Sequence, residues 1–376
     1  MRNETRALFR AYCSQIALIN GVANATEQFN VDPVIEQKLE DKMKESSEFL
    51  GMINVVPVTQ QEGQVLGLTT TSSIAGRTDT SNGVRIQPVD PTGNAEKRRY
   101  LCKDTEFNWS RKYALMDAWR HKPDFETLLR DAILQQQSRD RIMIGWYGTS
   151  AADQTDRTAN PLLQDVNFGW LYKIRTNAPA QVFNDGSLTV KTNGTNNAAL
   201  KAIYVKPGVE LFDANAAYNA TGGSTDADAD YSSLDALVLD AKRLIPEWWR
   251  GDTELVAIVG HDLVDDKYFT IAQETGATAT EVEATDRILR STKTLGGLPA
   301  VRVPFFPAGA LLITRLDNLS IYWQEETRRR FLKDEPEYKR IANYESVNEA
   351  YVVEEYEMCV LVENIVLGSA PARPAP

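Results

Sequence analysis

The order of apolar and polar positions in the first sixty residues predicts two helices joined by a linker. Over residues 3 to 20 one apolar face recurs at helical spacing, formed by Leu8, Tyr12, Ile16 and Ile19. Residues 22 to 30 follow no period and are typical of a linker. The cap-and-proline pair Asp32-Pro33 predicts a second helix that continues to Gly51. A short strand is expected over residues 53 to 58.

The next segment is polar, and its length is the first unusual feature of the chain. From Thr59 to about Lys103 it is rich in Thr, Ser, Gly, Gln and Asp. Asn82-Gly83 is a turn signal, and the flanks could pair as a long hairpin. A structureless loop of this size is uncommon in a compact domain. We therefore expect an extended hairpin that packs on a neighbouring subunit, with candidate contact residues Arg77, Asp79, Asn82 and Gly83.

The clearest helix begins at Pro123 and keeps one apolar face as far as Trp146. It ends at about Gly145 or Gly148, so its length is roughly 35 Å at 1.5 Å per residue. Residues 149 to 231 are polar and loop-rich, and the Gly- and Asp-rich run that closes them is a candidate domain boundary.

Apolar residues become denser after Ser232 and predict a mixed α/β unit of about 90 residues. Ser232 and Asp235 resemble a capping box at its first helix. The continuous apolar run over residues 255 to 260 is typical of a strand covered on both faces. Further elements are expected at 263–273 and 281–291 (helices) and at 300–304, 311–314 and 319–323 (strands). Residues 325 to 368 are strand-like.

Composition and charge narrow the function classes. The 376 residues are 43% hydrophobic, which excludes general disorder and a disulfide-framed miniature protein. The net charge is −11, which argues against non-specific nucleic-acid binding by the whole surface. The three cysteines, Cys13, Cys102 and Cys359, have no disulfide or zinc spacing and fit a reducing cytoplasm. No apolar run approaches the roughly 18 residues of a membrane span, so no membrane partner is expected.

Catalytic chemistry finds little support in the sequence. The two histidines are His121 and His261, and a Ser-His-Asp centre would need one of them as its base. His261 follows the expected buried strand and precedes Asp262, which is better explained as the start of a helix. His121 is expected on the surface. We expect no enzyme activity and no catalytic residues.

Acidic and glycine-rich motifs also have simpler explanations than a ligand site. Asp226, Asp228 and Asp230 alternate like the start of a calcium loop, but Tyr231 and Leu237 occupy the places of the required glycine and acid. The acidic residues at 262, 265 and 266 are better explained as solvated charges than as a metal cluster. No phosphate-binding glycine loop is present. No metal and no cofactor are expected.

Two further clusters are candidates for contacts between proteins. Trp248-Trp249 is more typical of a core or a subunit contact than of a sugar-binding platform. The run Arg328, Arg329 and Arg330 follows two glutamates. It is expected on a solvated or salt-bridged face or at a joint between subunits. A position on an inner surface near DNA is the less favoured interpretation.

Several ordered sequence segments carry a resemblance to a known family. They are INVVPV at 53–58, NPLLQDV at 160–166, YSSLDALV at 231–238, LPAVRVPFFPA at 298–308, NYES at 343–346 and YVVEEY at 351–356. With these, the chain resembles the major capsid proteins of peduovirus-type temperate tailed bacteriophages, from Met1 to about Gly368. The stretch from about 185 to 229 has no counterpart in the resemblance.

The resemblance implies an α+β chain with the Hong-Kong-97-type capsid fold. Its parts would be a removable N-terminal segment, an N-terminal arm, an extended hairpin loop, a peripheral domain with a spine helix, an axial α/β domain, the return strands of the peripheral domain and a mobile tail. On this chain they would fall at 1–29, 30–60, 61–104, 105–231 (spine 123–148), 232–318, 319–368 and 369–376.

The implied function is self-assembly into hexamers and pentamers that form the icosahedral head shell around phage double-stranded DNA. The implied partners are copies of the chain, an internal scaffold, a prohead protease, the portal protein and, weakly and non-specifically, the DNA. Assembly would take place in the bacterial host cytoplasm, and the product would be the virion capsid. Proteolytic maturation would cut near Phe29 and Asn30, inside the expected linker.

Two other functions stay open at this point. A cellular nanocompartment shell of the same fold would lack a protease-cleaved segment. A hydrolase built on residues 232 to 323 would need His261 or the nearby aspartates as catalytic groups.

Overall fold

The computed structural model describes residues 3–65, 74–77, 79, 85, 88, 99–119, 125–185, 202–205, 230–231, 233–260, 262–265 and 293–367. The chain divides into two compact units, each described by itself below. Unit 1 comprises residues 1–46, 55–137 and 320–354, and unit 2 comprises residues 47–54, 138–319 and 355–376. The expected helix at 281–291, the expected tail at 369–376 and His261 lie outside the described residues.

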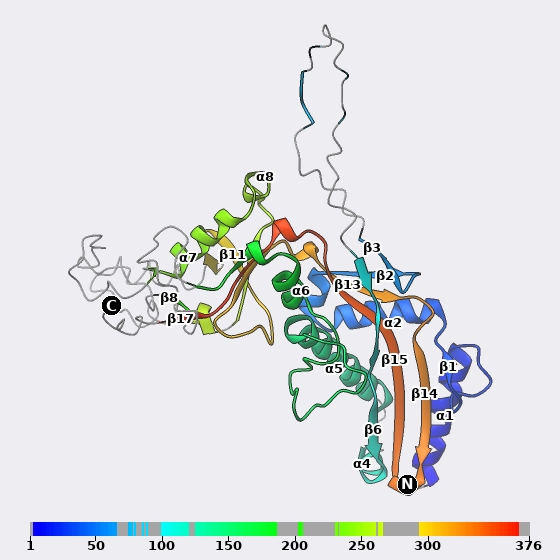
Figure 1. Ribbon diagram of the computed structural model, residues 1–376. Helices are drawn as coiled ribbons and strands as arrows, with labels where there is room; N and C mark the ends of the chain where they lie inside the picture. Colours follow the sequence, from blue (N-terminus) through cyan, green and yellow to red (C-terminus); the bar gives the residue numbers. More distant parts are fainter. Residues whose placement is uncertain are drawn as a thin grey trace, which may run out of the picture. The chain divides into compact units, whose positions relative to one another are not determined.

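Unit 1 is built on a seven-stranded sheet whose centre is a long antiparallel hairpin (Figure 1). Its strands are β1 (Phe29–Asn30), β2 (Asn54–Val58), β5 (Lys103–Glu106), β6 (Trp109–Lys112), β13 (Leu319–Gln324), β14 (Arg329–Glu335) and β15 (Arg340–Val353). The order is β1-β14-β15-β13-β2, and β5 and β6 also pair with β15. Lys339, with φ of 51°, allows the sharp turn between β14 and β15. The strand-like pattern of the C-terminal section is confirmed.

The helices of unit 1 are α1 (Asn3–Ile19), α2 (Pro33–Glu45), α4 (Tyr113–Trp119) and the first half of α5 (Phe125–Tyr147). The predicted first helix is confirmed, but Ile19 of its predicted apolar face is 50% exposed, and its buried residues include Phe9, Cys13 and Ile16. Gly21 ends the helix with φ of 64°. There the Val22 N–H donates to the carbonyl of Ala17, a bond typical of a left-handed C-terminal cap.

The predicted start of α2 is confirmed and its predicted end is wrong. Asp32 Oδ1 accepts from the Val34 N–H at 2.9 Å, so the cap is where the sequence placed it. The helix ends at Glu45, and α3 (Glu48–Met52) is a separate short helix of unit 2. Ser46 Oγ donates to the Met43 carbonyl at 2.8 Å, and Ser47 is extended. Serine side chains compete with the helix for hydrogen bonds to backbone groups. The helix end was missed in the sequence because the apolar spacing continues across the break.

The base of the predicted hairpin is confirmed. β3 (Glu62–Gln64) and β4 (Arg99–Leu101) pair antiparallel, with Gly63 opposite Tyr100. A side chain at Gly63 would meet the Tyr100 ring, with its Cβ 2.6 Å from the hydroxyl oxygen. Glycine therefore lets the Tyr100 ring lie against the backbone of β3 without moving.

Unit 2 contains a six-stranded mixed sheet covered by a helix. Its strands are β7 (Val182–Phe183), β9 (Val256–Val259), β10 (Thr294–Leu295), β11 (Leu298–Arg302), β12 (Leu311–Thr314) and β16 (Val360–Val362), in the order β10-β11-β9-β12-β16-β7. β8 (Ile203–Val205) and β17 (Ile365–Leu367) form a separate parallel pair. All four residues of β9 are buried, which confirms the strand predicted from the apolar run.

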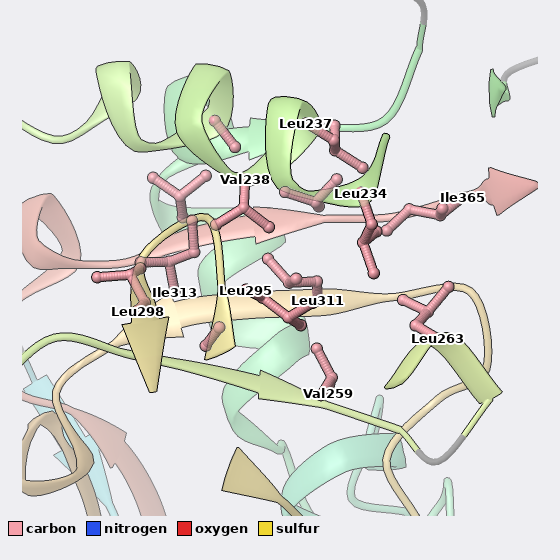
Figure 2. Packing of buried hydrophobic residues seen from close by; sticks show 14 of the residues in the cluster. Leu234, Leu237, Val238, Val259, Leu263, Leu295, Leu298, Leu311, Ile313 and Ile365 are labelled. Atoms are coloured by element: carbon pink, nitrogen blue, oxygen red, sulfur yellow. The ribbon is translucent and has the colours of Figure 1, made fainter. Parts of the chain in front are cut away.

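The helices α6 (Trp170–Asn177), α7 (Leu234–Ala241) and α8 (Glu247–Arg250) complete unit 2. Figure 2 shows Leu234, Leu237 and Val238 of α7 directed at sheet residues such as Leu311 and Ile313. The N-cap of α7 is Ser233, whose Oγ accepts from the Ala236 N–H at 3.2 Å, so the capping box predicted at Ser232 is wrong by one residue. Asp235 instead accepts from the Gly296 N–H at 2.7 Å.

The crossing of α5 and α6 depends on glycine. Trp146 and Trp170 are both buried, with ring centroids 5.0 Å apart. A Cβ on Gly145 would lie 2.1 Å from Trp170 Cζ3, so only glycine admits the ring. The long helix predicted from Pro123 is confirmed from Phe125 to Tyr147, and its first expected residues lie outside the described range.

Candidate assembly surfaces

The N-terminal segment of the chain is folded onto the sheet of unit 1. Figure 1 shows α1 alongside β14. Its inward side chains join a cluster with residues of the following turn and of the sheet: Phe9, Cys13, Ile16, Ala17, Ala25, Phe29, Val31, Leu332 and Ile341. Leu332 and Ile341 of the central hairpin are 0% and 2% exposed. The segment therefore completes the apolar core on this side of the sheet.

The linker expected between α1 and α2 ends in a strand, which corrects the reading from the sequence. Phe29 pairs with Arg330, and Asn30 pairs with Arg329, in an antiparallel ladder at the end of the sheet order. Leu332 N–H also donates to the Ala25 carbonyl at 3.3 Å. Phe29 is buried and Asn30 is exposed. The candidate processing residues and two of the three candidate arginines, which were predicted separately, thus lie side by side.

Polar contacts also hold the segment at two places along α1. Thr5 Oγ1 donates to Asp117 Oδ1 of α4 at 2.6 Å. Arg330 Nη2 donates to the Tyr12 hydroxyl at 3.3 Å, while its Nε donates to Asn343 Oδ1 at 2.9 Å.

Burial raises the pKa of the Cys13 thiol to about 11. The thiol is therefore neutral at physiological pH.

Arg328 lies in the interior of unit 1 and is 1% exposed. Its Nη1 donates to Glu345 Oε1 of β15 at 2.9 Å, and its Nη2 pairs with Glu40 Oε1 of α2. Its Nε lies 3.8 Å from Glu36 Oε1. These four side chains are the buried arginine cluster, and each is at most 8% exposed. Of the environments expected for Arg328, the structure shows ion pairs within its own chain, and a subunit joint stays a prediction.

Three carboxylates against one guanidinium leave the buried arginine cluster rich in negative charge. Burial raises the pKa of Glu36 to about 7, and the nearby charge of Arg328 opposes this rise only in part. Glu36 Oε2 accepts from the Glu326 N–H at 3.2 Å, and Gln137 Nε2 donates to Glu345 Oε2 at 3.4 Å. The buried residues of α2 are Glu36, Glu40 and Met43, and Ile35 and Leu39 also pack on the N-terminal cluster, so α2 is attached through both charge and apolar contacts.

The three arginines therefore have three different environments. Arg328 is buried, Arg330 is partly exposed and bound to Tyr12 and Asn343, and Arg329 is exposed. Of the three, Arg329 is the one whose side chain is exposed.

The hairpin base forms a second candidate surface. Tyr100 of β4 stacks edge-on against Tyr322 at 5.1 Å, and both join a cluster with Val65, Cys102, Ala350 and Val352. The base is thus fixed to the long strand β15. Arg77 and Asp79 are exposed, and Asn82 and Gly83 lie outside the described residues.

The remaining candidates of unit 2 do not converge. Asp262 Oδ2 accepts from the Gly309 N–H at 2.8 Å, and Asp265 pairs with Arg302 at 3.2 Å. Trp249 packs on the apolar core, while Trp248 is 60% exposed. Within the described part of the chain no three His, Cys, Asp or Glu side chains are grouped as metal ligands, and no helix is long and apolar enough to cross a bilayer.

Reasoning from the sequence missed the buried arginine cluster. Glu36 and Glu40 are four residues apart on one helical face, and Met43 continues that face. The apolar residues Ile35 and Leu39, which belong to the N-terminal cluster, masked this second face. A pair of acids at that spacing, together with a basic run elsewhere, was the available signal.

Comparisons with known proteins agree with each other. The family model described as phage major capsid protein, P2 family, matches residues 8–365. The capsid protein of Escherichia phage P2 is 41% identical over 378 aligned positions, 99% of this chain and 98% of the relative. The major capsid protein of Serratia phage KSP20 is 36% identical, with 97% of each covered. A chain in the satellite phage P4 procapsid that includes size determination (Sid) protein is 40% identical, with a TM-score of 0.74 and coverage of 98% and 99%.

Proposed function

The chain belongs to the P2 family of phage major capsid proteins and has their Hong-Kong-97-type fold, and from this premise we propose how its surfaces serve the icosahedral head shell. Copies of the chain form hexamers and pentamers that enclose double-stranded DNA. In a closed shell each joint is repeated many times, so individual contacts need only modest strength. A net charge of −11 fits weak, non-specific contact with the packaged DNA.

The hairpin of residues 61 to 104 is proposed as an arm that lies on a neighbouring copy. The support is the fixed base, where Tyr100 and Cys102 are buried against β15. An arm attached to a long central strand transmits force between subunits without unfolding at its root. Arg77, Asp79, Asn82 and Gly83 are its proposed contact residues, and Arg329 is proposed for a second joint.

The domain assignment follows the family. Residues 105–231 and 319–368 are proposed as the peripheral domain, 232–318 as the axial domain and 30–60 as the arm. In support, β15 pairs with both β5 and β6, which joins the C-terminal return strands to residues 103–112 in one sheet.

Residues 1 to 29 are proposed as a segment that engages internal scaffold and is then removed by a prohead protease near Phe29 and Asn30. Two features support this position. β1 stands at the end of the strand order, and Asn30 is exposed. Extended chain at a sheet edge is the form in which many proteins bind peptide strands. The portal protein is a further proposed partner, at one vertex of the shell.

The proposal is tested by producing the chain with and without scaffold and prohead protease. Negative-stain electron microscopy and intact mass are then measured on the same samples. We expect closed shells whose subunit is shorter by about 29 residues when the protease is present. Arg329→Glu should reduce shell yield, and Lys333→Glu on the same strand serves as the charge-matched control. A monodisperse monomer under every condition would contradict shell assembly, and shells with full-length subunits would contradict the trimming alone.

A further inference from the structure

We propose that residues 3 to 29 are a separable ligand of unit 1, which stays bound through non-covalent contacts after the chain is cut behind it. Cutting the chain and uncovering the edge of β14 are then two distinct steps. The biological role of this binding rests on the proposed trimming near Phe29 and Asn30. The non-covalent binding of the segment to unit 1 does not depend on that trimming.

The apolar contacts are those of a docked amphipathic helix. Phe9, Cys13 and Ile16 are each at most 9% exposed, whereas Leu18 on the opposite face is 81% exposed. A helix that lays one apolar face into a groove is a recurrent mode of peptide recognition. The groove here is lined by the sheet residues Leu332 and Ile341 and by half-buried side chains of α2 and α4.

Backbone and polar contacts lie along the whole length of the segment. Thr5 contacts Asp117 near the start of α1, and Tyr12 accepts from Arg330 in its middle. The Ala25 carbonyl and the β1 ladder contact β14 at the end of the segment. A cut at 29–30 leaves the contacts of α1, Ala25 and Phe29 on the fragment, while Asn30 and its pairing with Arg329 stay with the rest of the chain. The covalent link to α2 is lost.

The pairing of β1 with β14 indicates that the bound segment covers an edge of β14. β14 is seven residues long, and Phe29, the last residue of the segment, pairs with its second position, Arg330. Asn30, which pairs with Arg329, is not part of the segment. Leu332 N–H is occupied by the Ala25 carbonyl. Exposed strand edges are templates for pairing with other chains. While the ligand is bound, this edge and the apolar surface beneath α1 are covered, so release of the ligand, and not its cleavage, frees them.

The test uses the full chain with a sequence-specific protease site inserted between Glu27 and Gln28. Both residues are exposed, and they lie between the buried anchors Ala25 and Phe29. The fragment from this cut carries the contacts of α1 and Ala25 but not the pairing of Phe29 with Arg330, so its retention tests the helix groove itself. The folded protein is cut to completion and passed through a size-exclusion column under native conditions. Intact mass and peptide quantification of the protein peak then give the amount of fragment per chain. We expect about one fragment per chain.

Two substitutions in the same helix make the test specific. Ile16→Asp places a charge in the groove and should release most of the fragment after cutting. Leu18→Asp introduces the same charge on the exposed face and should retain it. Tryptophan fluorescence and circular dichroism of the peak report whether the remainder keeps its fold.

Loss of the fragment from the otherwise unsubstituted chain would overturn the proposal, and so would unfolding of the remainder after the cut. Equal retention by the two aspartate variants would also overturn it, because the groove would then not be the binding site. Since the engineered cut needs no phage protease, failure of the proposed trimming gives a different result: no natural cleavage at 29–30, with the fragment still bound after the engineered one.

Discussion

Replacement of Arg328 by methionine is the sharpest test of how α2 is held. Methionine retains an apolar side chain of similar reach but removes the charge that Glu36, Glu40 and Glu345 share. Removing one partner of a buried ion pair costs about 3–5 kcal/mol, because the remaining charge stays buried without compensation. Arg328 is 1% exposed and pairs with two of the carboxylates directly, so we expect a value in this range.

The assay must report on α2 rather than on the whole chain, because a chain of two units does not unfold in a single two-state step. Hydrogen exchange of the α2 amides measures the free energy of its opening. A loss of about 3–5 kcal/mol corresponds to a fall in protection of roughly two to three and a half orders of magnitude. Arg329→Met changes the same residue type at an exposed neighbour and should alter protection by less than about threefold.

A double variant separates charge from packing. If the cost comes from uncompensated carboxylates, Glu40→Gln should restore part of the protection lost in Arg328→Met, with an interaction free energy of about 0.5–3 kcal/mol. Additive effects of the two substitutions would refute the electrostatic reasoning. So would an Arg328→Met variant whose α2 protection equals that of Arg329→Met.

Three further predictions concern other groups. Burial raises the pKa of Glu36 from 4.5 to about 7, so the contribution of Glu36 to docking of α2 is fully present below pH 4.5 and is lost as the pH rises through 7. Glu36→Gln should remove this part of the pH dependence from the exchange profile. Gly145→Ala should destabilise unit 2 by roughly 1–3 kcal/mol in urea titration, because the new Cβ collides with Trp170, whereas Gly251→Ala, with nothing within 4 Å, should be close to neutral. Cys13, whose buried thiol has a pKa of about 11, should react slowly with iodoacetamide at pH 8, and more slowly than the same thiol after the chain is unfolded in urea.

Periodic patterns predicted the regular elements well. The extent of α1, the Asp32 cap of α2 and the fully buried strand β9 all follow from spacing within short windows. The errors came from local competition between side chains and backbone. Ser46 and Ser47 interrupt the helix although the apolar spacing in the sequence continues across them. The N-cap of α7 is Ser233, whereas the sequence predicted Ser232.

The candidate surfaces were less accessible to sequence reasoning because they depend on long-range pairing. Phe29 and Arg330 are three hundred residues apart, and no local pattern indicates that they share a ladder. The arginine run looked uniform in sequence, yet Arg329 and Arg330 belong to strand β14, whereas Arg328 precedes it. Arg328 is buried among carboxylates from α2 and β15, and Arg329 is exposed.

The contacts that hold α1 differ in kind from those that hold α2, and this difference suggests that the two helices have different roles. α1 is held mainly by apolar contacts, whose strength depends little on pH or salt. α2 is held by apolar contacts and also by buried charges, which keep an affinity for water and lose their balance when one proton is gained or lost. Apolar contacts suit an element that leaves a groove as one piece. Buried charges suit an element that changes position and remains folded. Trimming between α1 and α2 would then separate the α1 ligand from α2 at the short ladder of β1 on β14.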